Sequence, residues 1–364
     1  MAKKVAIISS VHDARDPRIS IRIPLILKDE FDVFLLAGFN DSYASDESYR
    51  QEYENGFVWI PLLRMISPAE RILRQSQIYS WIRENKPEII WCNDPELLPL
   101  CFAIRKIQKT KVIFDLHEDV FDPGYPRKPF LRSVVSLGLE NADLVVFAFE
   151  RELRPYHPEA KVSAIELLNY YPSPLKKESK KPELRDSIFL FTGIVHKSRG
   201  LADYLEILTI LSNKSPEIRG VIAGRCYEQS HLKWLKQEIT KQKLDSKITL
   251  MGGKEYISWF TLQELQRTSL LGAMLYPKDF MNWQYPTKLY EYTVNQLHYI
   301  ASDESSFRAF DEKYGGGFIY DSSNSDFRNQ IEEWLVNKDS KFTNLEAPCW
   351  MNQKSNLLGK LAVL

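Results

Sequence analysis

The sequence lacks long apolar runs, paired cysteines and an excess of charge of either sign. No stretch reaches the ~18 consecutive apolar residues that cross a membrane. Met1-Ala2-Lys3-Lys4 leads directly into a strand-like run, without the apolar segment of a signal peptide. No two cysteines form a C-x-x-C pair, so the sequence shows no zinc or redox motif. We expect the cysteines to be small, mostly buried side chains. The four are Cys92, Cys101, Cys226 and Cys349. These absences predict a protein of the reducing cytoplasm.

Lys plus Arg and Asp plus Glu are equally numerous, at 48 each, so the formal net charge is zero. Binding along a phosphate backbone needs a basic excess, and nucleic acid is therefore not an expected partner. The length of 364 residues predicts two domains, since a typical domain has ~150 residues. A hydrophobic fraction of 44% indicates a globular chain with sizeable cores.

The first half alternates buried strands with helices. Strands are predicted at Val5–Ile8, Asp32–Leu36, Phe57–Pro61, Glu88–Cys92 and Lys111–Leu116, with helices at about Pro68–Glu84 and Pro95–Gln108. This order is typical of a doubly wound parallel sheet, in which ligands bind beyond the carboxyl ends of the strands. Polar side chains follow three of these strand ends. Among these side chains are His12, Asp16, Asp94, His117 and Glu118, and we predict that they lie at the ligand site.

A second strand series follows a segment rich in proline and lysine, residues 171–187, which we interpret as an exposed linker. Its first strand, Ser187–Phe191, leads into Gly193, where the backbone can approach a ligand closely. His196, Lys197 and Arg199 follow before a helix, and arginine can hold a phosphate through two hydrogen bonds. The loop thus offers positive charge to a phosphate group, and the alternative is that these side chains are solvated.

A helix is predicted from about Pro286 to Asn295, since proline is favoured in the first turn of a helix. The N–H groups of that turn, with the Thr287 hydroxyl, can bind phosphate oxygens. Glu291 lies one turn further along the same face, where its carboxylate can accept hydrogen bonds from two ribose hydroxyls. A diphosphate beside a ribose indicates a nucleotide.

The run P-T-K-L-Y-E-Y at residues 286–292, followed by H-Y-I-A-S, resembles the nucleotide-sugar signature of retaining glycosyltransferases of family 4. The first loop, V-H-D-A-R-D-P-R-I, and the motifs N-D-P-E-L-L-P and F-D-L-H-E are similar to those of members that build bacterial surface polysaccharides. The resemblance implies the GT-B fold, in which two Rossmann-like α/β domains face a cleft and the last helix crosses back to the first domain.

The resemblance also assigns roles to residues. It implies that His117 contacts the donor sugar, that Arg199 and Lys197 act on the diphosphate, and that Gly252 and Gly253 hold the base through their backbone. The acceptor-side residues that it implies are His12, Asp16, Asp94 and Glu118; for His12, a contact with the sugar and a cap of the loop are the alternatives. The remaining donor-site residues that it implies are Gly193, His196, Trp283, Gln284, Tyr285, Pro286, Thr287, Lys288, Leu289 and Glu291. Two positions depart from the family pattern: Trp283 stands where many members have a first Glu, and Ile194 where an Arg is usual.

These observations predict an acceptor-binding domain at residues 1–170, a linker at 171–187, a nucleotide-sugar domain at 188–345 and a C-terminal segment at 346–364. The predicted activity moves a sugar from a nucleoside diphosphate sugar to a hydroxyl of a saccharide or lipid-linked saccharide, with retention and without a cofactor or metal ion. The alternatives are a nucleotide-sugar 2-epimerase and a non-catalytic protein that keeps the nucleotide pocket. The sequence does not specify the base, sugar, acceptor, linkage or oligomeric state.

A basic amphipathic segment at residues 62–74 suggests contact with the inner face of a membrane, through Arg64, Arg71 and Arg74. The alternative is that its apolar residues pack on the domain core while the arginines are solvated.

Overall fold

The chain forms two compact units, each built on one parallel sheet. The computed structural model describes residues 2–40, 45–64, 68–117, 129–150, 159–172, 185–277, 285–321, 324, 326–337, 342 and 348–364. Unit 1 comprises Met1–Pro172 with Cys349–Leu364, and unit 2 comprises Ser173–Pro348. The predicted linker lies largely outside the described residues. None of the described helices has both the length and the apolar composition needed to cross a bilayer.

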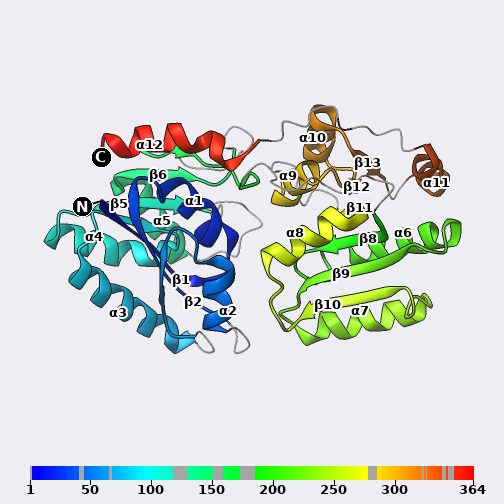
Figure 1. Ribbon diagram of the computed structural model, residues 1–364, viewed down its shortest axis with the longest axis horizontal. Helices are drawn as coiled ribbons and strands as arrows, with labels where there is room; N and C mark the ends of the chain where they lie inside the picture. Colours follow the sequence, from blue (N-terminus) through cyan, green and yellow to red (C-terminus); the bar gives the residue numbers. More distant parts are fainter. Residues whose placement is uncertain are drawn as a thin grey trace. The chain divides into compact units, whose positions relative to one another are not determined.

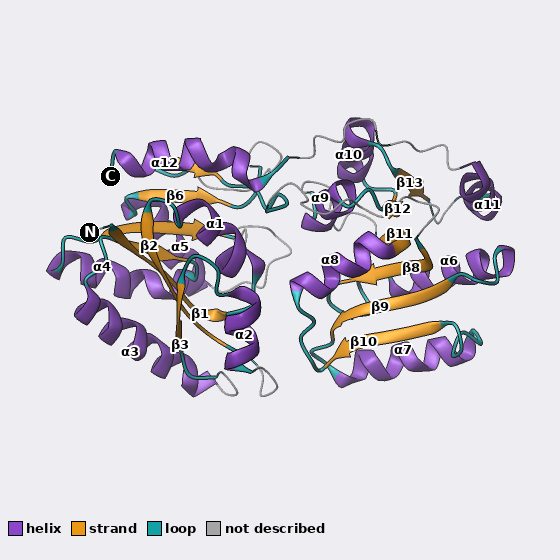
Figure 2. Cartoon of the chain, viewed as in Figure 1, coloured by secondary structure: helices purple, strands orange, loops and turns teal. Residues whose placement is uncertain are grey.

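Unit 1 has seven parallel strands in the order β3-β2-β1-β4-β5-β6-β7. The strands are β1 (Lys3–Asp13), β2 (Phe31–Gly38), β3 (Val58–Pro61), β4 (Ile89–Cys92), β5 (Lys111–Leu116), β6 (Leu144–Phe147) and β7 (Ala164–Glu166). The helices are α1 (Ile23–Leu27), α2 (Asp46–Tyr53), α3 (Pro68–Asn85), α4 (Leu98–Ile107) and α5 (Pro129–Asn141). Figure 2 shows helices on both faces of this sheet.

Successive side chains of a strand point to opposite faces of the sheet, and the apolar residues of the first sheet form a buried core on each face. Val5 and Ile7 of β1 belong to one apolar core, and Ala6 and Ile8 belong to the core on the opposite face. The C-terminal helix α12 (Lys354–Ala362), drawn in red in Figure 1, packs on the first of these cores through Leu357 and Leu361. The predicted return of the last helix to the first domain is therefore confirmed.

Unit 2 has six parallel strands in the order β10-β9-β8-β11-β12-β13. The strands are β8 (Asp186–Thr192), β9 (Arg219–Arg225), β10 (Ile248–Gly253), β11 (Ser269–Met274), β12 (His298–Ser302) and β13 (Gly317–Tyr320). The helices are α6 (Leu201–Lys214), α7 (Gln229–Lys241), α8 (Trp259–Thr268), α9 (Thr287–Val294), α10 (Ser305–Tyr314) and α11 (Phe327–Asn337). All four cysteines are buried and unpaired, as predicted.

The prediction for Arg74 is wrong, because this side chain is neither solvated nor available to a membrane. Arg74 is fully buried in α3. Its guanidinium donates to the backbone carbonyls of Leu63, Ser10 and Phe39 at 2.5, 3.0 and 2.6 Å, and to Asn40 Oδ1 at 3.0 Å. Arg74 therefore links β1 to the loops that follow β2 and β3, a role that local amphipathicity cannot reveal.

Candidate functional site

His12 and Asp94 form a closely spaced polar pair in unit 1, at the carboxyl ends of the neighbouring strands β1 and β4. His12 Nδ1 lies 2.5 Å from Asp94 Oδ1. Asp94 Oδ2 accepts hydrogen bonds from Ser9 Oγ at 2.8 Å and from the backbone N–H groups of Ser10 and Val11 at 2.6 and 2.9 Å. Burial raises the pKa of Asp94, but His12 and these donors outweigh it and hold the pKa well below its usual value. A buried carboxylate thus orients the imidazole, as in bases that activate hydroxyls.

His117 lies beside this pair, at the end of β5. Its ring stacks on that of His12 with centroids 4.9 Å apart. Nδ1 lies 3.0 Å from the Asp115 carbonyl oxygen, which only accepts, so Nδ1 carries the proton. Burial lowers the pKa of His117, against the opposing charge of Asp115, and favours the neutral ring. Nε2 is buried, has no hydrogen-bond partner among the described residues, and can accept a hydrogen bond from a ligand hydroxyl.

A buried ion pair supports these side chains. Arg18 Nη2 lies 2.7 Å from Asp115 Oδ1, and Trp91 Nε1 donates to the other Asp115 oxygen at 2.9 Å. Arg18 also donates to the Leu167 carbonyl at 2.9 Å and lies 5.4 Å from the ring centroid of Trp350. The loop after β1 is therefore held against β5 and the C-terminal segment. The predictions did not include Arg18, whose partners are far away in the sequence.

The two remaining acceptor-side predictions have different outcomes in the structure. Asp16 Oδ1 accepts a hydrogen bond from the Arg18 backbone N–H at 2.8 Å, so this carboxylate helps to form the turn after β1. Glu118 lies outside the described residues. The structure thus brings His12, Asp94 and His117 together and gives Asp16 a local role.

Unfolding free energy should decrease as the pH falls below about 6.5, the pKa of an unfolded histidine. Because the folded pKa of His117 is lower, the unfolded chain binds more protons in this range. The stabilisation by neutral His117 is complete above about pH 6.5 and is lost as the pH falls through the folded pKa. Urea unfolding between about pH 8 and pH 5 should show a shallower pH dependence in His117→Asn than in the unmodified protein. Equal slopes would contradict this account.

In unit 2, the predicted diphosphate loop and the start of α9 place two cations around one aromatic ring. Gly193, after β8, has φ +117°. Lys288 Nζ donates to the Thr192 carbonyl at 2.6 Å and lies 5.5 Å from the ring centroid of Tyr276. The Arg199 guanidinium carbon lies 5.6 Å from the same centroid. Burial raises the pKa of Tyr276, but the charges of Lys288 and Arg199 lower it overall. Arg199 and Lys288 therefore form a concentrated positive site.

Two other residues of the loop contact α7 instead. The His196 ring centroid lies 3.8 Å from that of His231, and Lys197 Nζ lies 5.5 Å from the ring centroid of Trp234. The structure thus divides the predicted diphosphate residues, with Arg199 beside Lys288 and with His196 and Lys197 against α7.

The predicted helix with Pro286 at its start is present as α9. Pro286 is the N-cap rather than the first helical residue, and Thr287 opens the helix. Leu289 is fully buried and its N–H donates to the Pro286 carbonyl at 2.9 Å, which indicates a structural role. The Tyr285 ring packs against Phe310, with centroids 5.5 Å apart. Trp283 and Gln284 lie outside the described residues.

Glu291 is largely buried and held by α8. Its Oε1 accepts a hydrogen bond from Trp259 Nε1 at 3.0 Å, and its Oε2 accepts one from Gln266 Nε2 at 2.9 Å. A carboxylate has about four acceptor positions, so a ligand hydroxyl can bind beside partners such as these. They also give Glu291 a structural role that the sequence did not reveal.

Glycines line the carboxyl ends of β8, β9 and β10. A Cβ on Gly224 would lie 1.6 Å from the Gly193 oxygen, and a Cβ on Gly252 would lie 2.7 Å from the Gly224 oxygen, so the three backbones pack closely. Gly252 and Gly253, predicted to hold the base, also line a cavity of about 170 Å³. Its other walls come from β9, β10, α7 and the loop after β8, including Val195 and Leu232.

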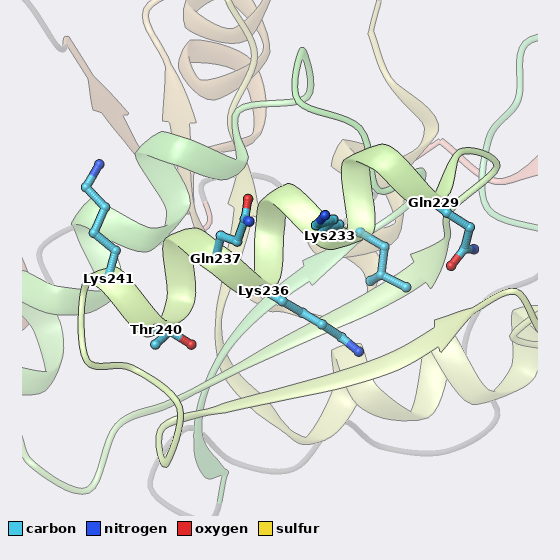
Figure 3. A pocket seen from close by; sticks show the side chains of 7 residues that line it. Gln229, Lys233, Lys236, Gln237, Thr240 and Lys241 are labelled. Carbon is cyan, nitrogen blue, oxygen red and sulfur yellow. The ribbon is translucent and has the colours of Figure 1, made fainter.

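A larger hollow of about 780 Å³ runs along α7 (Figure 3). All of its lining residues belong to this one helix: Gln229, Leu232, Lys233, Lys236, Gln237, Thr240 and Lys241. Because no second element contributes a wall, it is an open surface groove, and we do not assign the nucleotide to it.

No protein-family model matches the sequence, and no curated protein matches it. Solved structures do match. HepE from Anabaena, in complex with UDP and glucose, has a TM-score of 0.70 at 14% identity, with 100% of both chains covered. Sucrose-phosphate synthase from Thermosynechococcus elongatus has a TM-score of 0.66 at 13% identity, covering 99% of this chain and 98% of that one.

An α,α-trehalose-phosphate synthase (UDP-forming) from Burkholderia vietnamiensis has a TM-score of 0.56 at 12% identity, covering 100% of this chain and 96% of that one. At such identities the likeness establishes the fold alone. The predicted two-domain α/β GT-B fold is confirmed.

Proposed function

We propose that the protein transfers a sugar from a nucleoside diphosphate sugar to an acceptor hydroxyl, with retention of the anomeric configuration. The observation that carries this proposal is the positive site formed by Arg199 and Lys288 beside the glycine-lined strand ends of unit 2. Glu291 follows Lys288 on the same helix by three residues, so a ribose and a diphosphate can be bound together. UDP is the best-supported nucleotide, because HepE was solved with UDP and the trehalose-phosphate synthase is UDP-forming.

The chemistry requires stabilisation of the diphosphate as it leaves the sugar. Arg199 and Lys288 supply two fixed positive charges for this purpose, and the first turn of α9 supplies N–H groups. With retention, the departing phosphate accepts the proton of the acceptor hydroxyl, while His12 orients that hydroxyl. His117 Nε2 would accept a hydrogen bond from the donor sugar.

The contact between His12 and Asp94 also favours a second stereochemical course. A carboxylate-oriented imidazole can itself remove the proton of the acceptor hydroxyl, which suits direct displacement with inversion. Nuclear magnetic resonance of the product distinguishes the two, since the new linkage keeps or reverses the anomeric configuration of the donor. An inverted product would refute retention and assign the base role to His12.

A thermal-shift screen with UDP, GDP, ADP and dTDP tests the nucleotide site. A ligand at about one hundred times its Kd adds ~2.7 kcal/mol to the unfolding free energy. We expect the largest shift with UDP. The absence of a shift with all four nucleotides would contradict the proposed donor site.

Glu291→Gln should weaken UDP binding by about 1.5–3 kcal/mol, because a charged hydrogen-bond acceptor is lost. Calorimetry of UDP binding measures this change. The amide must also place its NH₂ group against the donor of either Trp259 or Gln266, so the free variant should unfold at a lower temperature. Gln266→Leu removes one structural partner but retains the carboxylate, and serves as the matched control. Equal UDP affinity in Glu291→Gln and the unmodified protein would refute the ribose assignment.

We also propose a lipid-linked saccharide acceptor, reached by peripheral contact of α3 with an anionic membrane. Ile72 and Leu73 are 70% and 51% exposed in the first turns of α3, next to the partly exposed Arg71. The first turns of α3 lie at the edge of the sheet that carries His12 and Asp94, because helices in such a sheet run antiparallel to the strands. The apolar pair and Arg71 thus replace the three arginines of the sequence-based hypothesis.

Flotation with liposomes of anionic lipid tests this contact. Burial of each apolar side chain contributes about 1.5–3 kcal/mol, so Ile72→Asp with Leu73→Asp should reduce binding more than about tenfold. Ile107→Asp is the matched control, because Ile107 is 77% exposed at the carboxyl end of α4, toward the opposite edge of the sheet. No flotation of the unmodified protein at low salt, or an equal loss in the control, would refute the contact.

A further inference from the structure

Three potential metal ligands converge in unit 2, where the sequence showed no metal motif. His196 lies in the loop after β8, Glu228 immediately precedes α7, and His231 lies in the first turn of α7. One ligand atom from each residue lies within 4.8 Å of the other two. His231 Nε2 is 3.4 Å from Glu228 Oε2. Because one helix, α6, and one strand, β9, separate His196 from the other two residues, sequence spacing could not identify the group.

We propose that His196, Glu228 and His231 bind a divalent transition-metal ion, with Zn²⁺ the best match. Two imidazole nitrogens and one carboxylate are a ligand set that zinc uses, with a fourth position left for water. Mg²⁺ and Ca²⁺ prefer oxygen ligands and fit this set poorly. Co²⁺ and Ni²⁺ share the preference for imidazole and can serve as probes.

The surroundings of the two histidines suit this assignment. Ser198 holds the His196 ring in place: its backbone N–H donates to His196 Nδ1 at 3.1 Å, and its Oγ lies 2.7 Å from the same nitrogen. His231 is only 13% exposed, and its Nδ1 is buried with no hydrogen-bond partner in the described part of the chain. The neighbouring Lys197 directs its ammonium to the face of Trp234, where the aromatic ring attracts it.

A bound ion would join the loop after β8 to the start of α7. Glu228 and His231 are three residues apart and face the same side of the helix start. The third ligand, His196, lies in the loop after β8, which also carries Arg199. The ion would restrain this loop, and an effect on nucleotide binding would follow if the proposed function holds. The metal site itself does not depend on that function.

Metal binding by the full chain can be measured without any assay of activity. After treatment with a chelator and its removal, we expect Zn²⁺ to raise the thermal unfolding temperature and Mg²⁺ to leave it unchanged. Titration calorimetry should give one Zn²⁺ per chain. Co²⁺ should produce the visible absorption of a four- or five-coordinate site with nitrogen and oxygen ligands.

His231→Asn should weaken Zn²⁺ binding by more than about tenfold, since even loss of a partner behind a ligand costs ~10–100-fold. Glu228→Gln should act in the same direction. Glu238→Gln is the matched control, because Glu238 lies on α7 with Lys241 three residues later, and it should bind Zn²⁺ normally. Circular dichroism without metal establishes that each variant is folded. No Zn²⁺ binding by the unmodified protein, or undiminished binding by folded His231→Asn and Glu228→Gln, would overturn the proposal.

Discussion

Arg199→Ala should lower kcat about 10²–10³-fold, equivalent to about 2.7–4 kcal/mol of transition-state stabilisation, the loss typical for one preorganised charge-stabilising donor. The positive charges act most strongly when negative charge grows on the departing diphosphate. The guanidinium of Arg199 and the ammonium of Lys288 both lie beside the ring of Tyr276. Lys288→Ala should therefore have an effect of similar size, with a smaller change in UDP affinity than in kcat.

Lys197→Ala provides the comparison within the same loop. Lys197 was predicted to act on the diphosphate, but its ammonium faces Trp234. We therefore expect a smaller loss of kcat than in Arg199→Ala. Steady-state kinetics of the three variants with the natural donor measures the difference. An unchanged kcat in Arg199→Ala, or a larger loss in Lys197→Ala, would remove Arg199 from the mechanism.

Asp94→Asn and His12→Ala should each lower kcat, by about 10²-fold where His12 only orients the acceptor hydroxyl and by up to about 10⁴-fold where it also removes the proton. In Asp94→Asn the new amide would present an NH₂ group or a neutral oxygen to His12 Nδ1, and would lose the strong orientation that the carboxylate gives. It would also weaken the hydrogen bonds that Ser10 and Val11 donate to this side chain. The kinetic loss should therefore exceed any change in UDP affinity.

UDP binding serves as the internal control for these two variants, because His12 and Asp94 belong to unit 1 and the predicted nucleotide residues belong to unit 2. A UDP-induced thermal shift equal to that of the unmodified protein would establish that unit 2 is intact. Full turnover by Asp94→Asn would contradict a role for the oriented imidazole in either stereochemical course.

Features set by local sequence were predicted closely. The strand at residues 111–116 was predicted at its observed bounds, and the helix predicted from Pro68 extends to Asn85. The helix beginning near Pro286 was also correct. Alternating apolar runs and turn residues determine such elements within about twenty residues of chain, so a single sequence suffices to predict them.

Features that depend on distant partners were not predicted. The burial of Arg74 depends on backbone carbonyls from β1 and from the loops that follow β2 and β3. The hydrogen bonds of Glu291 come from α8, and the contact of His196 comes from α7. The sequence identified charged and polar residues at the correct strand ends, but the direction of each side chain is set by tertiary packing.

Sugar transfer by this protein is tested most directly by following both the nucleotide and the sugar of a nucleotide sugar during one incubation. UDP-glucose or UDP-N-acetylglucosamine is supplied with a pool of saccharide and lipid-linked saccharide acceptors, and the products are identified by mass spectrometry and nuclear magnetic resonance. The proposed function predicts free UDP together with the sugar in a new glycosidic bond, dependent on acceptor and strongly reduced in Arg199→Ala. A sugar that changes configuration while still attached to UDP would identify an epimerase, and UDP binding without conversion of any donor would identify a non-catalytic protein. Either result would contradict the claim.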